Sequence, residues 1–247
     1  MKPKPTFKIQ SSETGTEYVI YVEAPKKNEP KKPWPAVLFM DGDDQFSAAV
    51  AAYREALADG IVPPTLLVGV GYGASYAKPE NKRGRDYTPT PHSDEPTSGG
   101  AAQFTAFLAE TLWPELAKRY PVDKKQRGIA GHSLGSLLVL YALWQEPLFF
   151  THYLASAPSI WWDNRGILKI AARRRARKSA LSARLFLSVG EKDSPSMTGD
   201  LALLEQQLGA KPFSGLDLTI RRFARKNHFN VLPEAFRAGL TTLFGKP

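Results

Sequence analysis

Residues 130–144 read AGHSLGSLLVLYALW and place one serine between two glycines, in front of an apolar run. The spacing Gly131, Ser133, Gly135 is a G-x-S-x-G, which presents a nucleophilic serine when a strand precedes it and a helix follows. The short apolar end of RGIA before it predicts a buried strand, and leucines at helical spacing after it predict a helix. The segment therefore predicts a sharp strand-to-helix turn that exposes Ser133, against the alternative of a small residue in a structural turn.

Strand-like and helix-like segments alternate on both sides of this turn. Apolar runs predict strands at residues 16–24, 36–40, 65–70, 152–156, 184–190 and 216–223. Helical spacing predicts helices at residues 46–60, 101–120, 165–178, 200–209 and 232–244, with a break or kink near Pro114. This alternation predicts an α/β fold with a mostly parallel central sheet, helices on both faces and an antiparallel N-terminal edge.

Length and composition favour one domain over residues 1–247. A chain of 247 residues with 43% hydrophobic content can bury a sizeable core. The Lys- and Pro-rich residues 25–35 predict a loop that is too short to separate domains. Because the chain has no cysteine, disulfides and cysteine-based zinc sites are excluded.

The charge of the chain favours acidic partners. The net charge is +9 and the isoelectric point is about 9.6, which suits an anionic substrate, a membrane surface or nucleic acid. The densest basic cluster, residues 172–178, has no aromatic side chain between its arginines, so it favours a solvated helix face over nucleic-acid binding. No apolar run approaches the length of a membrane span. The N-terminus lacks an apolar signal core, so we expect a cytoplasmic protein, although a chain trimmed of its signal would look the same.

A serine nucleophile needs a base and an acid that orients it. His228 follows a predicted strand and precedes the last helix, at the sheet edge where this architecture places catalysis. Asp193 stands three residues after the end of another strand, which leaves the chain room to turn back toward the site. Glu191 has a longer side chain and is the alternative acid, whereas Asp200 suits the start of the following helix.

Backbone N–H groups are expected to bind the oxyanion of the tetrahedral intermediate. One is the N–H of Leu134, next to the nucleophile, and the other comes from Gly42 or Asp43 after the strand at residues 36–40. The bunched acidic residues there lack the spacing of a metal-ligand set, so we expect no metal. The chain has no phosphate-binding or dinucleotide-binding glycine motif, and we expect no cofactor.

The chain resembles the putative-esterase group of the α/β-hydrolase superfamily, and within it the enterobactin-esterase type that cleaves ferric siderophore triesters. The matching segments are LFMDGD, RGRDYTPT, GHSLGSLLVLYAL, SAPSIWWDN and NHFNVLP, across about residues 36–244. The resemblance implies an α/β-hydrolase fold, catalysis by Ser133 and His228, and a pocket lined by Arg85 and Trp161. It leaves the acid open, because some members of this type work with a weak or absent third residue. From the residues alone, Arg85 could instead pair with its neighbouring aspartate, and the tryptophans could belong to the core.

We therefore expect a serine carboxyl-ester hydrolase that forms an acyl-enzyme, on a small-molecule ester that is anionic or aromatic, such as a siderophore triester. One alternative is acyl transfer to another alcohol, as in the related mycolyltransferases. A second alternative is an inactive binding protein on a hydrolase scaffold.

Overall fold

The computed structural model describes residues 4–26 and 33–245, which form one eight-stranded sheet in the order β1-β2-β4-β3-β5-β6-β7-β8. The strands are β1 (Phe7–Gln10), β2 (Glu17–Glu23), β3 (Trp34–Phe39), β4 (Leu66–Gly71), β5 (Val122–His132), β6 (His152–Ser156), β7 (Ala180–Gly190) and β8 (Ser214–Phe223). Most of the loop predicted at residues 25–35 lies outside the described residues. Because one sheet joins the first and last strands, the structure supports our proposal of a single domain.

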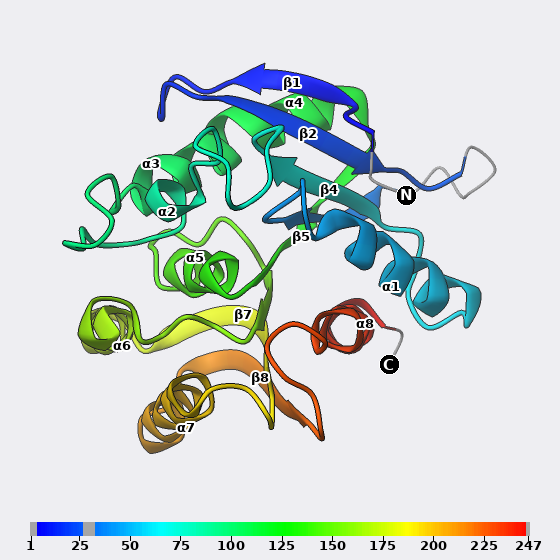
Figure 1. Ribbon diagram of the computed structural model, residues 1–247. Coiled ribbons are helices and arrows are strands. Elements are labelled where there is room, and N and C mark those ends of the chain that lie inside the picture. Colours follow the sequence, from blue (N-terminus) through cyan, green and yellow to red (C-terminus); the bar gives the residue numbers. More distant parts are fainter. Residues whose placement is uncertain (1–3, 27–32, 246–247) are drawn as a thin grey trace.

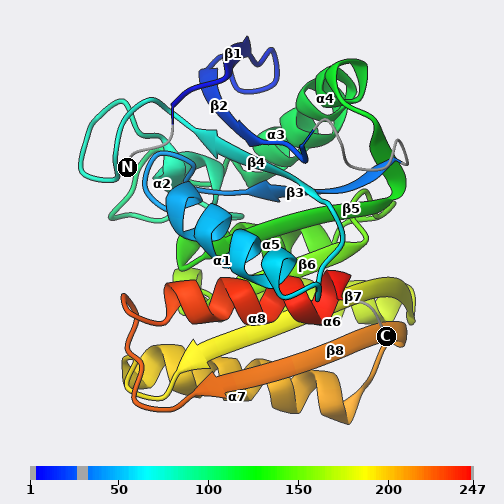
Figure 2. The same cartoon turned by 90° about the vertical axis from the view of Figure 1, so that its right-hand side faces the viewer.

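Helices cover both faces of the sheet, as predicted (Figure 1). They are α1 (Phe46–Ala58), α2 (Arg83–Asp86), α3 (Ala101–Ala106), the π-helical η1 (Phe107–Leu112), α4 (Trp113–Arg119), α5 (Leu134–Leu143), α6 (Trp162–Arg177), α7 (Pro195–Ala210) and α8 (Leu232–Phe244). Helices α1 and α8 lie side by side on one face, and the larger helical layer covers the other (Figure 2). Two buried apolar clusters, one on each face, hold these layers to the sheet.

The strands from β3 to β8 run parallel, and the N-terminal strands form the antiparallel edge. β2 pairs with β4, while β3 lies between β4 and β5. Parallel pairing brings the ends of β3, β4, β5, β7 and β8 to one edge, where the loops carry the candidate site.

Three local predictions need correction. Residues 71–100, for which the sequence predicts no strand or helix, contain the short helix α2. The break expected near Pro114 is a π-helical turn just before it, and the chain stays helical because proline is tolerated in the first turn of α4. Asp200 does not start α7: it lies buried in the second turn of that helix and forms an ion pair with Arg165.

The basic cluster at residues 172–178 is mostly a solvated face of α6, as predicted. The exception is Arg174, which is buried and donates hydrogen bonds to the carbonyls of Lys178 and Ala180. None of the helices in the described part of the chain has the length and apolar character needed to span a membrane.

Candidate active site

Ser133 occupies a strained turn between β5 and α5. Its φ is +59° and its ψ is −123°, a backbone conformation that residues other than glycine rarely adopt. Glycine is required at position 131, because a Cβ there would lie 2.4 Å from the carbonyl carbon of Gly135, and a Cβ on Gly135 would lie only 3.1 Å from Met40 Cβ. The strand, the turn and the helix therefore form the nucleophile elbow that the G-x-S-x-G spacing predicts.

His228 and Asp193 meet across the ends of two strands. The loop after β7 and the loop after β8 touch at Gly190, where a Cβ would lie 2.3 Å from the carbonyl oxygen of Lys226. Asp193 turns back through a hydrogen bond from its N–H to the carbonyl of Gly190. The Asp193 side chain is buried, and its Oδ2 accepts a hydrogen bond from His228 Nδ1 at 2.9 Å. In a neutral imidazole with its proton on Nδ1, the lone pair is on Nε2, which is then the atom that can accept a proton.

Glu191 has a different environment from Asp193. Its N–H donates to the carbonyl of Phe223, and the residue is exposed. The geometry therefore ranks Asp193 above Glu191 as the acid, in the order that the sequence predicts.

His132 lies against the His228 ring. The two ring centroids are 4.6 Å apart, and both residues border the same cavity. Burial, followed by the electrostatic effect of His228, lowers the pKa of His132 to about 3, so the ring is neutral. It hydrogen bonds to the backbone of His228 and to Ser156 Oγ, and these bonds tie the His228 loop to the elbow. His152, by contrast, is buried at the start of β6 and stacks on Phe244.

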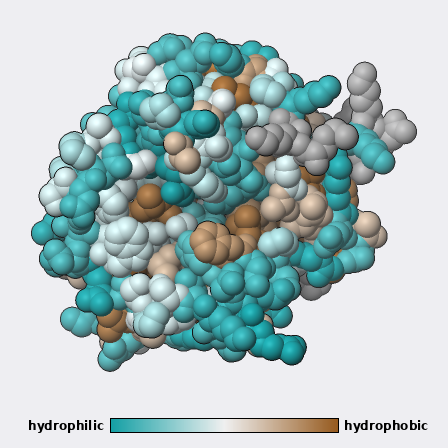
Figure 3. All heavy atoms as spheres, viewed as in Figure 1, coloured by the Kyte–Doolittle hydropathy of each residue, from teal (hydrophilic) through white to brown (hydrophobic). Residues whose placement is uncertain are grey.

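A cavity of about 350 Å³ opens beside the elbow. The residues that line it are Asp44, Gln45, Tyr76, Arg83, His132, Ser133, His228, Phe229 and Leu232. The Ser133 hydroxyl lies 3.4 Å from Ser159 Oγ. Apolar atoms gather at the centre of the same face, over the loop that leads into α8, and hydrophilic residues surround them (Figure 3).

The loop after β3 carries Gly42 and Asp43, the two residues predicted as alternative donors to the oxyanion. The N–H of Gly42 is engaged, because it donates to the carbonyl of Val70 at 2.9 Å. The N–H of Asp43 and the N–H of Leu134, the first residue of α5, have no acceptor among residues 4–26 and 33–245. Of the two candidates on this loop, the geometry therefore favours Asp43.

Arg83, and not Arg85, is the arginine of this cavity. Arg83 forms a two-bond ion pair with buried Asp41, at 2.8 and 3.1 Å, and its guanidinium lies over the Tyr76 ring. Burial alone would lower the pKa of Arg83, but the charge and hydrogen bonds of Asp41, together with the neighbouring tyrosines, outweigh burial and raise the pKa, so the guanidinium keeps its charge.

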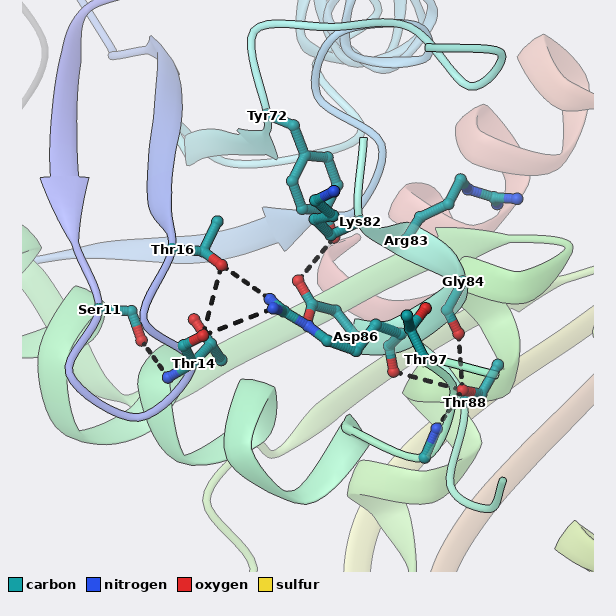
Figure 4. Close-up of polar contacts among 12 residues, drawn as sticks. Ser11, Thr14, Thr16, Tyr72, Lys82, Arg83, Gly84, Asp86, Thr88 and Thr97 are labelled. Carbon is teal, nitrogen blue, oxygen red and sulfur yellow. Dashed lines mark hydrogen bonds and ion pairs between the residues drawn. The ribbon is translucent and has the colours of Figure 1, made fainter. Parts of the chain in front are cut away.

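Arg85 points to the other side of α2, where it holds that helix to β2. Its guanidinium bonds Asp86 at 2.7 Å and Thr16 at 2.8 Å, and buried Asp86 also accepts hydrogen bonds from Tyr18 and Tyr72. Figure 4 shows Asp86 and Thr16 on this side, with Arg83 pointing the opposite way. The prediction that Arg85 lines the pocket is therefore corrected, and the pairing alternative describes it.

Trp161 does not line the cavity either. It is 43% exposed and lies two residues after Ser159, the residue that approaches the Ser133 hydroxyl. Trp162 is the buried member of the pair, and its indole donates to the carbonyl of Thr90. In the part of the chain that the structure describes, no three His, Asp or Glu side chains are grouped as metal ligands.

Comparisons with known proteins show the family of the chain. The family described as "Putative esterase" matches residues 11–211. The chain belongs to this family. It is 30% identical to the ferri-bacillibactin esterase BesA of Bacillus subtilis over 245 residues, which cover 91% of this chain and 84% of that protein.

Solved structures extend the likeness to the fold. The BES protein from Bacillus cereus superimposes with a TM-score of 0.86 at 29% identity, over 95% of this chain and 92% of that one. The siderophore hydrolase EstB from Aspergillus nidulans superimposes with a TM-score of 0.84 at 26% identity, over 96% of this chain and 94% of that one. The chain therefore has the α/β-hydrolase fold and is a carboxylic ester hydrolase.

Proposed function

We propose that this esterase hydrolyses its substrate through an acyl-enzyme on Ser133. The observation that carries the proposal is the bond between His228 Nδ1 and the buried Asp193 carboxylate, which lies beside the same cavity as the strained Ser133 elbow. A carboxylate at Nδ1 fixes the tautomer in which Nε2 is the base, and it stabilises the imidazolium that forms when the serine loses its proton.

The residues of the site have defined roles in the proposed reaction. Ser133 and His228 border the same cavity, and His228 Nε2 takes the proton of Ser133 Oγ as this oxygen attacks the ester carbonyl carbon. The N–H groups of Leu134 and Asp43 stabilise the oxyanion. The tetrahedral intermediate then collapses, the bond from the carbonyl carbon to the alcohol oxygen breaks, and His228 protonates the leaving alcohol. Water repeats the sequence on the acyl-enzyme and releases the acid.

We propose an iron-siderophore ester as the substrate. The names of BesA and EstB support this class. The site also suits a substrate larger than its cavity, because Phe229 is 85% exposed beside His228 and Tyr76 is 44% exposed across from it. Aromatic rings at a rim offer contact area to the non-reacting arms of a multi-armed aromatic ester. The cytoplasmic location stays a prediction of the sequence.

Paired kinetics on the parent enzyme test the substrate class. We expect a ferric tris-catecholate triester to be cleaved with a higher kcat/KM than a small neutral aryl ester, and the released fragments can be followed by chromatography. If only the aryl ester is cleaved, the result is consistent with the serine mechanism but contradicts the proposal that the substrate is a siderophore ester. Transfer of the acyl group to an added alcohol, in preference to water, would favour the acyltransferase alternative.

A further inference from the structure

The side chain of Asp43 is held at three points. Its Oδ1 accepts hydrogen bonds from Tyr21 Oη at 2.5 Å and from the N–H of Gly73 at 3.0 Å, and its Oδ2 accepts one from the N–H of Tyr72 at 2.6 Å. The approach is close, because a Cβ on Gly71 would lie 2.4 Å from Oδ2. A carboxylate with charge-assisted bonds in three directions has little freedom to move.

The backbone next to this carboxylate is fixed as well. A Cβ on Gly42 would lie 2.9 Å from the backbone of Gly69 and Val70 and from the ring of Tyr21. Tyr21 itself is buried on β2, opposite Gly69 of β4 in the sheet. The segment from Gly42 to Asp43 therefore packs directly against β2 and β4.

Tyr21 does not border the cavity that contains Ser133. Burial first, and then the hydrogen bond to Asp43, raise the pKa of Tyr21, so the phenol keeps its proton and stays a donor. A residue in this position can affect catalysis through Asp43 without touching the substrate.

We propose that the Asp43 carboxylate and Tyr21 are positioning groups that hold the N–H of Asp43 toward the oxyanion. The inference rests on the proposed function, in which that N–H is one of two oxyanion donors. This N–H stabilises the transition state only if it already points toward the oxyanion position before the reaction begins, because a preorganised donor requires no reorganisation in the transition state. Loosening the carboxylate lets the N–H swing away while the substrate, held by the cavity walls, still binds.

The test compares Tyr21→Phe with the parent on a small aryl ester. We expect kcat to fall by roughly 5- to 50-fold with KM within about twofold, because small misplacements of a catalytic group are costly. The inhibition constant of a boronic acid, which forms a tetrahedral adduct on the serine, should rise by a similar factor. Asp43→Asn should show the same pattern with a larger loss, since its amide cannot accept from all three donors.

Tyr153→Phe is the matched control. Tyr153 is also buried, and its Oη donates to the carbonyl of Phe150 at 2.9 Å, on a part of β6 outside the cavity. This control should lower the melting temperature as Tyr21→Phe does and leave kcat unchanged. Parent-like kcat in Tyr21→Phe, or equal losses in both variants, would overturn the inference. Ser133→Ala tests the proposed function separately. Failure of the positioning inference can therefore be distinguished from failure of the proposed function.

Discussion

At the scale of single residues, the role of the acid follows from one hydrogen bond. Asp193→Asn keeps the shape of the side chain but presents an amide that favours the wrong tautomer of His228, so we expect kcat to fall by about 10²- to 10⁴-fold. Glu191→Gln should stay near the parent rate, because Glu191 is exposed. Steady-state kinetics on an aryl ester check both variants, and a larger loss in Glu191→Gln would reverse the assignment.

The neutral His132 predicts a pH dependence of stability. The pKa of His132 falls from 6.5 to about 3 on folding, mainly through burial. Below about pH 6.5 the unfolded chain binds a proton that the folded chain refuses, so the free energy of unfolding decreases as the pH falls. Between about pH 7 and about pH 5 this one residue should cost about 2 kcal/mol. Urea unfolding should show a shallower decline in His132→Gln, and parallel declines would refute a buried neutral ring.

Spacing and chain order predict Ser133, His228 and Asp193, whereas the arginine of the pocket was assigned only by the family resemblance. The resemblance indicated Arg85, and the structure places Arg83 at the cavity. Arg83 and Arg85 stand two positions apart on a four-residue helix, so they face opposite sides of it. Which side meets the cavity depends on how α2 packs against β2 and the Asp41 loop. Such contacts join residues far apart in the chain, and no local pattern encodes them.

At the scale of elements, the loop between β8 and α8 displays an apolar ring. Asn227 Oδ1 accepts the N–H groups of Phe229 and Asn230, and Asn230 Oδ1 accepts the N–H of Asn227. The loop is therefore braced, and Phe229 stays exposed next to His228. We expect Phe229→Ala to raise KM for a large aromatic siderophore ester by roughly 5- to 30-fold, because a buried aromatic contact contributes about 1–2 kcal/mol.

A small acetate ester should be cleaved by Phe229→Ala with a KM close to that of the parent. Leu203→Ala on α7 removes another exposed apolar side chain, away from the cavity, and serves as the control. If both esters lose affinity equally in Phe229→Ala, then the ring supports the catalytic loop and does not bind the substrate arms.

Periodicity in the sequence predicted which segments are helices and which are strands. It did not predict which strands pair with each other in the sheet. The strand at residues 152–156 and the helix at residues 232–244 have the expected bounds, because their apolar patterns are strong and local. The place of β3 between β4 and β5 arises from pairing between distant segments. The π-helical turn before Pro114 also depends on packing, since the proline alone indicated a break.

At the scale of the whole molecule, the net charge of +9 should assist the capture of an anionic substrate. Long-range attraction weakens as salt shortens the Debye length, which is about 8 Å at physiological ionic strength. We therefore expect kcat/KM for a ferric tris-catecholate to fall as salt is added, while kcat/KM for a neutral aryl ester stays nearly constant. Equal salt slopes would show that the basic surface has no part in substrate capture.

The central claim is that Ser133 is the nucleophile of this esterase. Its most direct measurement is the mass of the intact protein after reaction with a fluorophosphonate, with peptide mapping of the adduct, alongside the rate of ester hydrolysis. We predict one adduct on Ser133 in the parent and no adduct in Ser133→Ala. The rate of Ser133→Ala should be lower by about 10⁴-fold or more, and its circular dichroism spectrum should match that of the parent. An adduct on another residue, or a Ser133→Ala rate within about tenfold of the parent, would contradict the account.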